Sequence, residues 1–112
     1  EYLNNMKDGA ILVNTARAEI TDVAAILNAV DKGKLKGFAT DVIENESKIF
    51  GKEFQNEKLP DELIQKAVEL FPKVLITPHI GSYTEEALKD MISISYDNFN
   101  DVLTTGKSKN LL

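Results

Sequence analysis

Side chains that can bind an anion or move a proton follow three short apolar runs of this chain. Arg17 comes after the first run, and Asp41 and Glu46 come after the second. His79, the one histidine in the 112 residues, comes after the third. An arginine can hold a carboxylate through two parallel hydrogen bonds, and a histidine backed by a carboxylate can pass a proton to a substrate. This set of groups suits the reduction of a 2-keto acid.

The three apolar runs are typical of strands in a parallel sheet. Residues 10–13 (AILV) are bounded by polar and turn residues and predict a strand that is buried on both faces. Residues 37–42 and 74–76 predict the second and third strands. Ligands of open parallel sheets gather at the carboxyl ends of the strands, which lie about 5 Å apart. We therefore expect the four side chains to converge on one small molecule.

Two helices are predicted between the strands. Asp22 is a good N-cap for a helix that carries one apolar face and ends at Gly33. The stretch at residues 47–59 is polar and lacks a clear period, so we expect a surface excursion there. Pro60 is then expected to begin the second helix.

A long helix is predicted at the C-terminal end of the chain. Residues 82–85 (SYTE) resemble a capping box, and an apolar stripe runs along residues 84–105 up to Gly106. The full order of elements predicts an α/β protein. Its expected architecture is a partial Rossmann-type parallel sheet (βαβαβ) followed by a long C-terminal helix.

The composition excludes several classes of partner and site. The formal net charge is −5 and the pI about 4.8, which argues against nucleic acid and anionic membranes as partners. Without cysteine, the chain has no disulfide and no thiolate metal site, and one histidine makes a zinc site unfavourable. A cysteine-free, acidic chain fits the cytoplasm, which is the location that we expect.

Each candidate residue also has a structural interpretation, which the sequence leaves open. Arg17 can form a surface ion pair, for example with Glu19, and Asp41 can cap the loop after its strand. His79 can be a structural histidine, and Glu46 can belong to a solvated loop. The chain carries no G-x-G-x-x-G phosphate cradle and no G-x-S-x-G nucleophile motif. A hydrolase is therefore disfavoured.

The three blocks together resemble the D-isomer-specific 2-hydroxyacid dehydrogenases. The resemblance is carried by residues 6–17 (MKDGAILVNTAR), by residues 37–42 (GFATDV) with Glu46, and by residues 74–79 (VLITPH). Ile-Phe at residues 49–50 and Tyr-Thr after the histidine block look most like the D-lactate dehydrogenase branch. Chains of this family are considerably longer, so the resemblance implies that this one is a C-terminal part.

The resemblance also implies a role for each residue and NAD as the cofactor. Arg17 would hold the substrate carboxylate, His79 would be the acid/base, and Glu46 would pair with the histidine. The positions expected to contact the nicotinamide end of NAD are Thr15, Ala16, Arg17 and Asp41.

The implied reaction is the reduction of pyruvate to D-lactate with NADH. The chain departs from the family pattern in two places. Ala18 stands where the family usually has glycine, so a different local turn is expected there. Gly81-Ser82 replace bulkier residues near the substrate pocket, which weakens the substrate assignment. A larger 2-keto acid such as 2-ketoisocaproate is therefore an alternative substrate. A non-catalytic NAD-sensing protein like the C-terminal binding protein corepressors is an alternative of a different class.

The resemblance further implies how the chain is divided. Residues 1–83 would be the C-terminal half of the NAD-binding domain, and residues 84–112 a helix that packs back toward the substrate domain. The phosphate-binding half and the substrate domain would be missing, so we expect these residues alone to be inactive. An unpaired edge on the first strand leads us to expect a homo-oligomer. The expected small-molecule partner is a 2-keto or 2-hydroxy acid.

Overall fold

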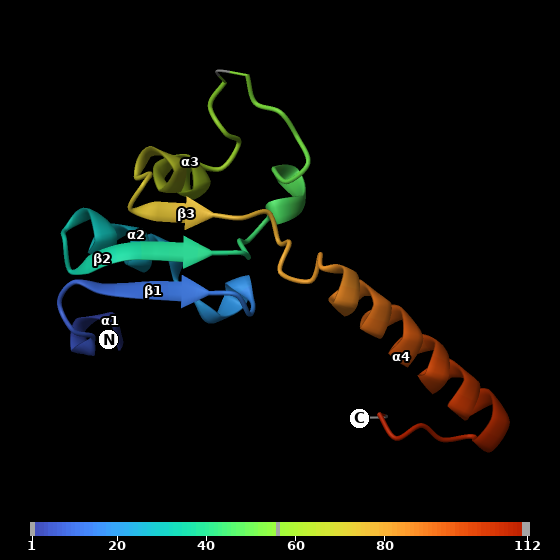
Figure 1. The fold of residues 1–112 in the computed structure, drawn as a ribbon. Coiled ribbons are helices and arrows are strands. Elements are labelled where there is room, and N and C mark those ends of the chain that lie inside the picture. The colour runs from blue at the N-terminus through green and yellow to red at the C-terminus, as the bar shows by residue number, and fades with distance from the viewer. Residues whose placement is uncertain (1, 56, 111–112) are drawn as a thin grey trace. The chain divides into compact units, whose positions relative to one another are not determined.

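The computed structural model describes residues 2–55 and 57–110, and its elements alternate between strands and helices (Figure 1). In chain order they are α1 (Tyr2–Asn5), β1 (Ala10–Asn14), the 3₁₀ helix η1 (Ala18–Ile20), α2 (Val23–Asp31), β2 (Leu35–Thr40), the 3₁₀ helix η2 (Glu46–Lys48), α3 (Glu62–Glu69), β3 (Val74–Ile76) and α4 (Glu85–Thr105). This order confirms the predicted α/β class, with a partial Rossmann-type sheet and a long C-terminal helix.

The three strands form one parallel sheet in the order β1-β2-β3. Leu12 is opposite Phe38, which in turn is opposite Val74, so these three side chains form one row across the sheet. Figure 1 shows that all three strands run in the same direction, with their carboxyl ends at one edge. The loops that carry the candidate residues leave from that edge.

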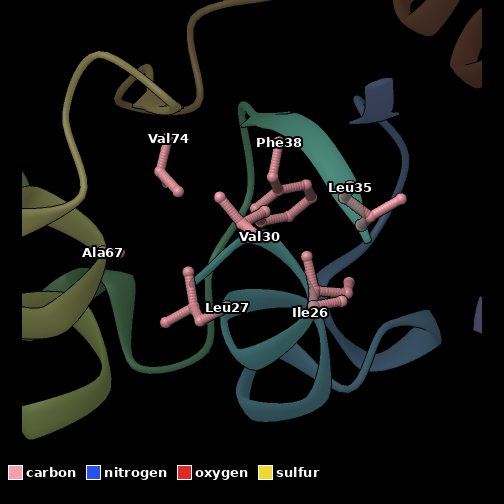
Figure 2. Packing of buried hydrophobic residues seen from close by; sticks show 8 residues of the cluster. Ile26, Leu27, Val30, Leu35, Phe38, Ala67 and Val74 are labelled. Atoms are coloured by element: carbon pink, nitrogen blue, oxygen red, sulfur yellow. The ribbon is translucent and has the colours of Figure 1, made fainter. Parts of the chain in front are cut away.

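The hydrophobic core lies between the sheet and the helices α2 and α3. Leu27 and Val30 of α2 are fully buried, and Phe38 of β2 packs against them (Figure 2). Burial of such side chains contributes about 1.5–3 kcal/mol each and is the main force that holds the helices on the sheet. The buried members of this cluster are Ile26, Leu27, Ala29, Val30, Leu35, Phe38, Ala67 and Val74.

The opposite face of the sheet is open, which corrects one expectation. Ile11 and Val13 of β1 are 62% and 61% exposed, and Leu75 of β3 is 50% exposed. The prediction that the first strand is buried on both faces was therefore wrong for this chain. The reason is that α2 and α3 both pack on the other face, so alternate side chains of each strand stay in contact with solvent.

The helix start at Asp22 and the helix end at Gly106 were predicted correctly. Asp22 caps α2, since its side chain accepts a hydrogen bond of 2.9 Å from Ala25 N. Gly106 follows α4 with φ of 74°, a left-handed conformation that glycine adopts without a steric penalty.

Two other helix starts lie beyond the residues that the sequence favoured. Asp61, not Pro60, stands directly before α3, and its side chain accepts hydrogen bonds from the backbone N–H groups of Leu63 and Ile64. Thr84 caps α4 through Ala87 N at 3.1 Å. In both cases a residue with a side-chain oxygen closer to the helix satisfies its first free N–H groups.

The second strand begins and ends earlier than expected, at Leu35–Thr40 in place of 37–42. Gly37 shows why a small residue is needed inside it. A Cβ atom at this position would lie 3.0 Å from the backbone oxygen of Lys73, which also accepts the hydrogen bond of Phe38 N at 2.9 Å. Asp41 consequently lies just past the end of the strand, at the edge where the loops gather.

The chain divides into two compact units, the first ending at Ile80 and the second beginning at Gly81. The second unit consists of α4 and the residues around it. None of the 21 residues of α4 is buried, and its apolar stripe is exposed, with Phe99 at 65% and Leu103 at 70%. In the described part of the chain, no helix is long and apolar enough to span a membrane.

Candidate active site

Glu46 and His79 form a hydrogen-bonded pair at the carboxyl edge of the sheet. His79 Nδ1 lies 2.8 Å from Glu46 Oε1, and the two side chains are 43% and 34% exposed. An ionised carboxylate can only accept, so the proton of this bond sits on Nδ1. The second ring nitrogen, Nε2, is thereby left to exchange a proton with a ligand. The sequence placed these residues after neighbouring strands, and the fold brings them into contact.

The backbone around His79 is held in an unusual conformation. His79 has a φ of 54°, in the left-handed region that residues other than glycine seldom adopt. Its backbone N–H donates to the oxygen of Thr77 at 3.0 Å. Strained positions of this kind persist where the surroundings fix them, and they cluster at functional sites.

Asp41 fixes the loop on both sides of His79. Its Oδ1 accepts a hydrogen bond from Thr77 Oγ1 at 2.5 Å and another from Ile80 N at 3.0 Å. The Asp41 side chain is buried, with 8% of the residue exposed. The structural interpretation of Asp41 thus has support, but the segment that it caps is the one that carries His79.

Glu46 also follows a left-handed residue. Asn45 has a φ of 57° and stands directly before the short helix η2, which begins at Glu46. The backbone N–H of Lys48 donates to Asn45 O at 2.9 Å and closes this turn. Glu46 lies within this turn, and its side chain contacts His79 of the neighbouring loop.

Arg17 extends from the loop after β1. Its guanidinium donates to Ala16 O at 2.8 Å. Among the described residues it forms no ion pair, so the alternative pairing with Glu19 is not found. A guanidinium that keeps its other donors can bind an anion in the bidentate manner.

The three predicted catalytic residues line one hollow. Arg17, Glu46 and His79 all border a depression of about 420 Å³, together with Ala18, Glu19, Val42, Ile43, Glu44 and Asn45. All of these residues belong to the first compact unit. Such a volume accommodates a small organic acid, with one cation and one proton donor on its walls.

Thr15 and Asp41 border a second, smaller hollow of about 70 Å³ on the open face of the sheet. The row of Val13, Ala39 and Leu75 contributes to its apolar walls. Ala16 lines neither hollow and takes part through its backbone, which donates to Asn14 and accepts from Arg17. Of the four residues expected at the cofactor, Thr15 and Asp41 therefore border the smaller hollow, and Arg17 borders the larger one.

The whole first unit matches a known family. Residues 1–81 match the model of the D-isomer specific 2-hydroxyacid dehydrogenase, NAD binding domain. This chain belongs to that family. The resemblance drawn from the three sequence blocks is confirmed, and NAD, the cofactor that we expected, is the cofactor of this dehydrogenase domain.

Individual dehydrogenases are similar to the chain over nearly its whole length. An aromatic 2-oxoacid reductase of Clostridium sporogenes is 36% identical over 110 residues, which are 98% of this chain and 33% of the reductase. Among solved structures, a D-lactate dehydrogenase from Sporolactobacillus sp has a TM-score of 0.82 and 34% identity, with 98% of this chain and 33% of that chain covered. The NAD-complexed D-isomer specific 2-hydroxyacid dehydrogenase of Lactobacillus delbrueckii ssp. bulgaricus has a TM-score of 0.81, 29% identity and the same coverage.

The chain spans about a third of the length of the relatives that it matches.

The small hollow on the open sheet face has the chemistry that the nicotinamide end of the cofactor requires. Its row of Val13, Ala39 and Leu75 suits the flat face of a ring, and the threonine hydroxyls and Asp41 suit a carboxamide. The residues present in this dehydrogenase domain therefore fit that part of NAD.

Asn14 is a residue of the site whose importance the sequence did not reveal. It is the last residue of β1 and is 4% exposed. Its side chain makes three hydrogen bonds to the loop that carries Arg17. The available signal was a polar residue at the end of an apolar run, since a buried amide needs partners nearby.

Proposed function

We propose that this chain forms the C-terminal part of an NAD-dependent D-lactate dehydrogenase, which reduces pyruvate to D-lactate with NADH. The observation that carries the proposal is the pairing of Glu46 with His79 at 2.8 Å in a hollow that Arg17 also lines. The family supplies the wider class, 2-hydroxyacid oxidoreduction. A 2-keto acid has a carboxylate for the arginine and a carbonyl oxygen for the histidine.

Arg17 binds and orients the substrate in this mechanism. Its planar guanidinium donates two parallel hydrogen bonds to a carboxylate, which fixes both the position and the plane of the acid group. With the carboxylate held, the adjacent keto group can face only a limited part of the hollow. Orientation of this kind replaces the random approach of two reactants and lowers the activation free energy.

His79 supplies the proton. The Nδ1–H group is engaged by Glu46, so Nε2 of the protonated ring donates to the keto oxygen as negative charge develops there. The Glu46 carboxylate stabilises the positive charge of the imidazolium and fixes the ring. When bound, NADH supplies the hydride that reduces the keto carbon. In the direction of D-lactate oxidation, neutral His79 accepts the hydroxyl proton.

A larger 2-keto acid such as 2-ketoisocaproate is the alternative substrate. Gly81 and Ser82 are small where bulkier residues are often found in the lactate branch. The relative from Clostridium sporogenes is an aromatic 2-oxoacid reductase, which makes a wide substrate pocket a reasonable second candidate. One extra methylene group changes binding in an apolar pocket by about 1–3 kcal/mol, so the preference is measurable.

The test uses a full-length enzyme that contains these residues. NADH oxidation is followed with pyruvate, with 4-methyl-2-oxopentanoate and with phenylpyruvate, and kcat/KM is compared. We expect turnover of all three with the highest value for pyruvate. A higher value for either larger acid would move the assignment to the alternative. A protein that binds NADH but turns over none of them would be the non-catalytic sensor.

The whole enzyme would have a defined division into domains, an oligomeric state and a cellular location. We propose residues 1–83 as the C-terminal half of its NAD-binding domain and residues 84–112 as a helix that packs toward the substrate domain. The first strand β1 lies at an edge of the three-stranded sheet, and this edge supports a homo-oligomer, to be measured by solution scattering. Cytoplasmic location, to be measured by cell fractionation, agrees with an acidic, cysteine-free chain.

A further inference from the structure

The side chain of Asn14 uses all of its hydrogen-bonding groups on one loop. Its Oδ1 accepts from Ala16 N at 3.0 Å, and its Nδ2 donates to Arg17 O at 2.9 Å and to Thr21 Oγ1 at 3.2 Å. A backbone N–H can only donate and a carbonyl oxygen can only accept. The orientation of the amide is therefore fixed by the chemistry of its partners, and a carboxylate cannot replace it.

These bonds enclose the backbone of Arg17. Ala16, which bonds the Asn14 side chain, directly precedes Arg17. The carbonyl oxygen of Arg17 is the second partner of that side chain, and Thr21, the third, follows the short helix η1. Arg17 itself is extended, with φ of −146° and ψ of 144°, and its guanidinium bonds back to Ala16 O. Asn14 thus determines the direction in which the arginine side chain leaves the loop.

The backbone of Asn14 connects this loop to the next strand end. Its carbonyl oxygen accepts hydrogen bonds from Asp41 N at 3.0 Å and from Thr40 Oγ1 at 3.2 Å. Asp41 in turn holds the loop of His79. One buried residue therefore links the support of the arginine to the support of the histidine.

We propose that Asn14 is a positioning residue that orients Arg17 for the carboxylate of the 2-oxo acid, without contact with the substrate. The proposal rests on the proposed function of Arg17. It predicts a specific defect: removal of the amide weakens binding of the 2-oxo acid more than it slows turnover, and more than it weakens NADH binding. A purely structural asparagine would instead lower the stability and affect all kinetic constants in the same proportion.

The test is a double-mutant cycle in the full-length enzyme, with KM for pyruvate, KM for NADH and kcat as readouts. We expect Asn14→Ala to raise KM for pyruvate about tenfold, and to change it less than about twofold in an Arg17→Ala background, since coupled residues are not additive. Thr21→Val is the matched control, because it removes one partner of Asn14 and leaves the bonds to Ala16 and Arg17 in place.

An equal rise of KM for pyruvate in both backgrounds, or no rise for Asn14→Ala, would overturn the proposal. An unchanged KM in Arg17→Ala alone would overturn the proposed function itself, because the carboxylate would then be held elsewhere. If Asn14→Ala does not fold, Asn14→Asp replaces it in the cycle. Aspartate has nearly the same volume and keeps the acceptor for Ala16 N, but it cannot donate to Arg17 O.

Discussion

Glu46 and His79 lie 33 positions apart in the chain, yet Glu46 Oε1 and His79 Nδ1 are 2.8 Å apart. The contact exists because the two residues leave neighbouring parallel strands at the same edge. Asp41 anchors the histidine loop from the other side through Thr77 and Ile80. If Glu46 and His79 act as proposed, changes to any support of this pair should therefore be visible in the kinetics.

Replacement of Glu46 by glutamine should lower kcat about 100-fold, the usual range for the loss of an effective acid/base group. Glutamine keeps the size and can still accept a hydrogen bond, but it lacks the charge that stabilises the imidazolium. Steady-state kinetics of the full-length enzyme measure the effect. Glu44→Gln is the control, since Glu44 borders the same hollow while the carboxylate bonded to His79 is that of Glu46. Equal activities of the two variants would refute the role of Glu46.

Replacement of Arg17 by lysine should raise KM for pyruvate about tenfold or more. Lysine keeps the charge but loses the second parallel hydrogen bond, and a hydrogen bond to a charged group contributes about 1.5–3 kcal/mol. The measurement is KM for pyruvate beside KM for NADH in the full-length enzyme. Lys32→Met, a change at an exposed cation directly after the end of α2, should leave both constants as they are. A lysine variant with normal KM would count against carboxylate binding by Arg17.

Replacement of Leu27 by alanine should destabilise the first unit by about 2–5 kcal/mol, because the side chain is fully buried and its loss leaves a cavity. Leu75→Ala removes the same atoms from a side chain that is 50% exposed, so a much smaller loss is expected. Urea unfolding of both variants gives the comparison. Similar free energies of unfolding for the two variants would contradict the burial of Leu27 in the hydrophobic core.

Acid should release the contact between Asp8 and Lys34. The Lys34 ammonium donates a hydrogen bond of 2.6 Å to Asp8 Oδ1 and attracts its charge, which lowers the pKa of Asp8 from the ordinary value of 3.8. The small stabilisation from this exposed pair is therefore present above pH 3.8 and is lost as the pH falls through the lower folded-state pKa. A carboxyl-carbon NMR titration should show the midpoint of Asp8 rise in Lys34→Met and stay in Lys36→Met. Identical midpoints in the wild type and Lys34→Met would contradict the contact.

The 112 residues alone should not oxidise NADH with pyruvate. They contain the groups proposed to hold the acid and move the proton, but no glycine-rich loop to bind the cofactor phosphates. An absorbance assay at 340 nm measures the oxidation of NADH, with the full-length enzyme as the positive control. Measurable turnover by these residues would mean that the pyrophosphate contacts are dispensable.

Local signals in the sequence predicted much of the sheet unit. The apolar run at residues 74–76 is the third strand, and Asp22 begins its helix as expected. These features depend on a few neighbouring residues, which is why they can be read from the sequence. The pairing of Glu46 with His79 followed from strand ends and from the family resemblance together.

Features that depend on distant contacts were missed. Burial of β1 depends on which face the helices cover, and its own sequence cannot reveal that Ile11 is exposed. The role of Asn14 depends on the loop that its side chain bonds, and the left-handed His79 lies in a loop that Asp41 holds through Thr77 and Ile80. The sequence alone also did not separate two adjacent candidates for the start of α3, Pro60 and Asp61, because the choice depends on the hydrogen bonds that the Asp61 side chain accepts.

The helix α4 has a thermal behaviour of its own. Its ends are set by the flanking caps Thr84 and Gly106, and none of its 21 residues is buried. A helix without tertiary burial gains and loses turns gradually, whereas a packed core melts cooperatively. Circular dichroism of the 112 residues should therefore show a shallow loss of helical signal beneath the sharp transition of the sheet unit. In a longer protein, the disappearance of that shallow component would report the docking of α4.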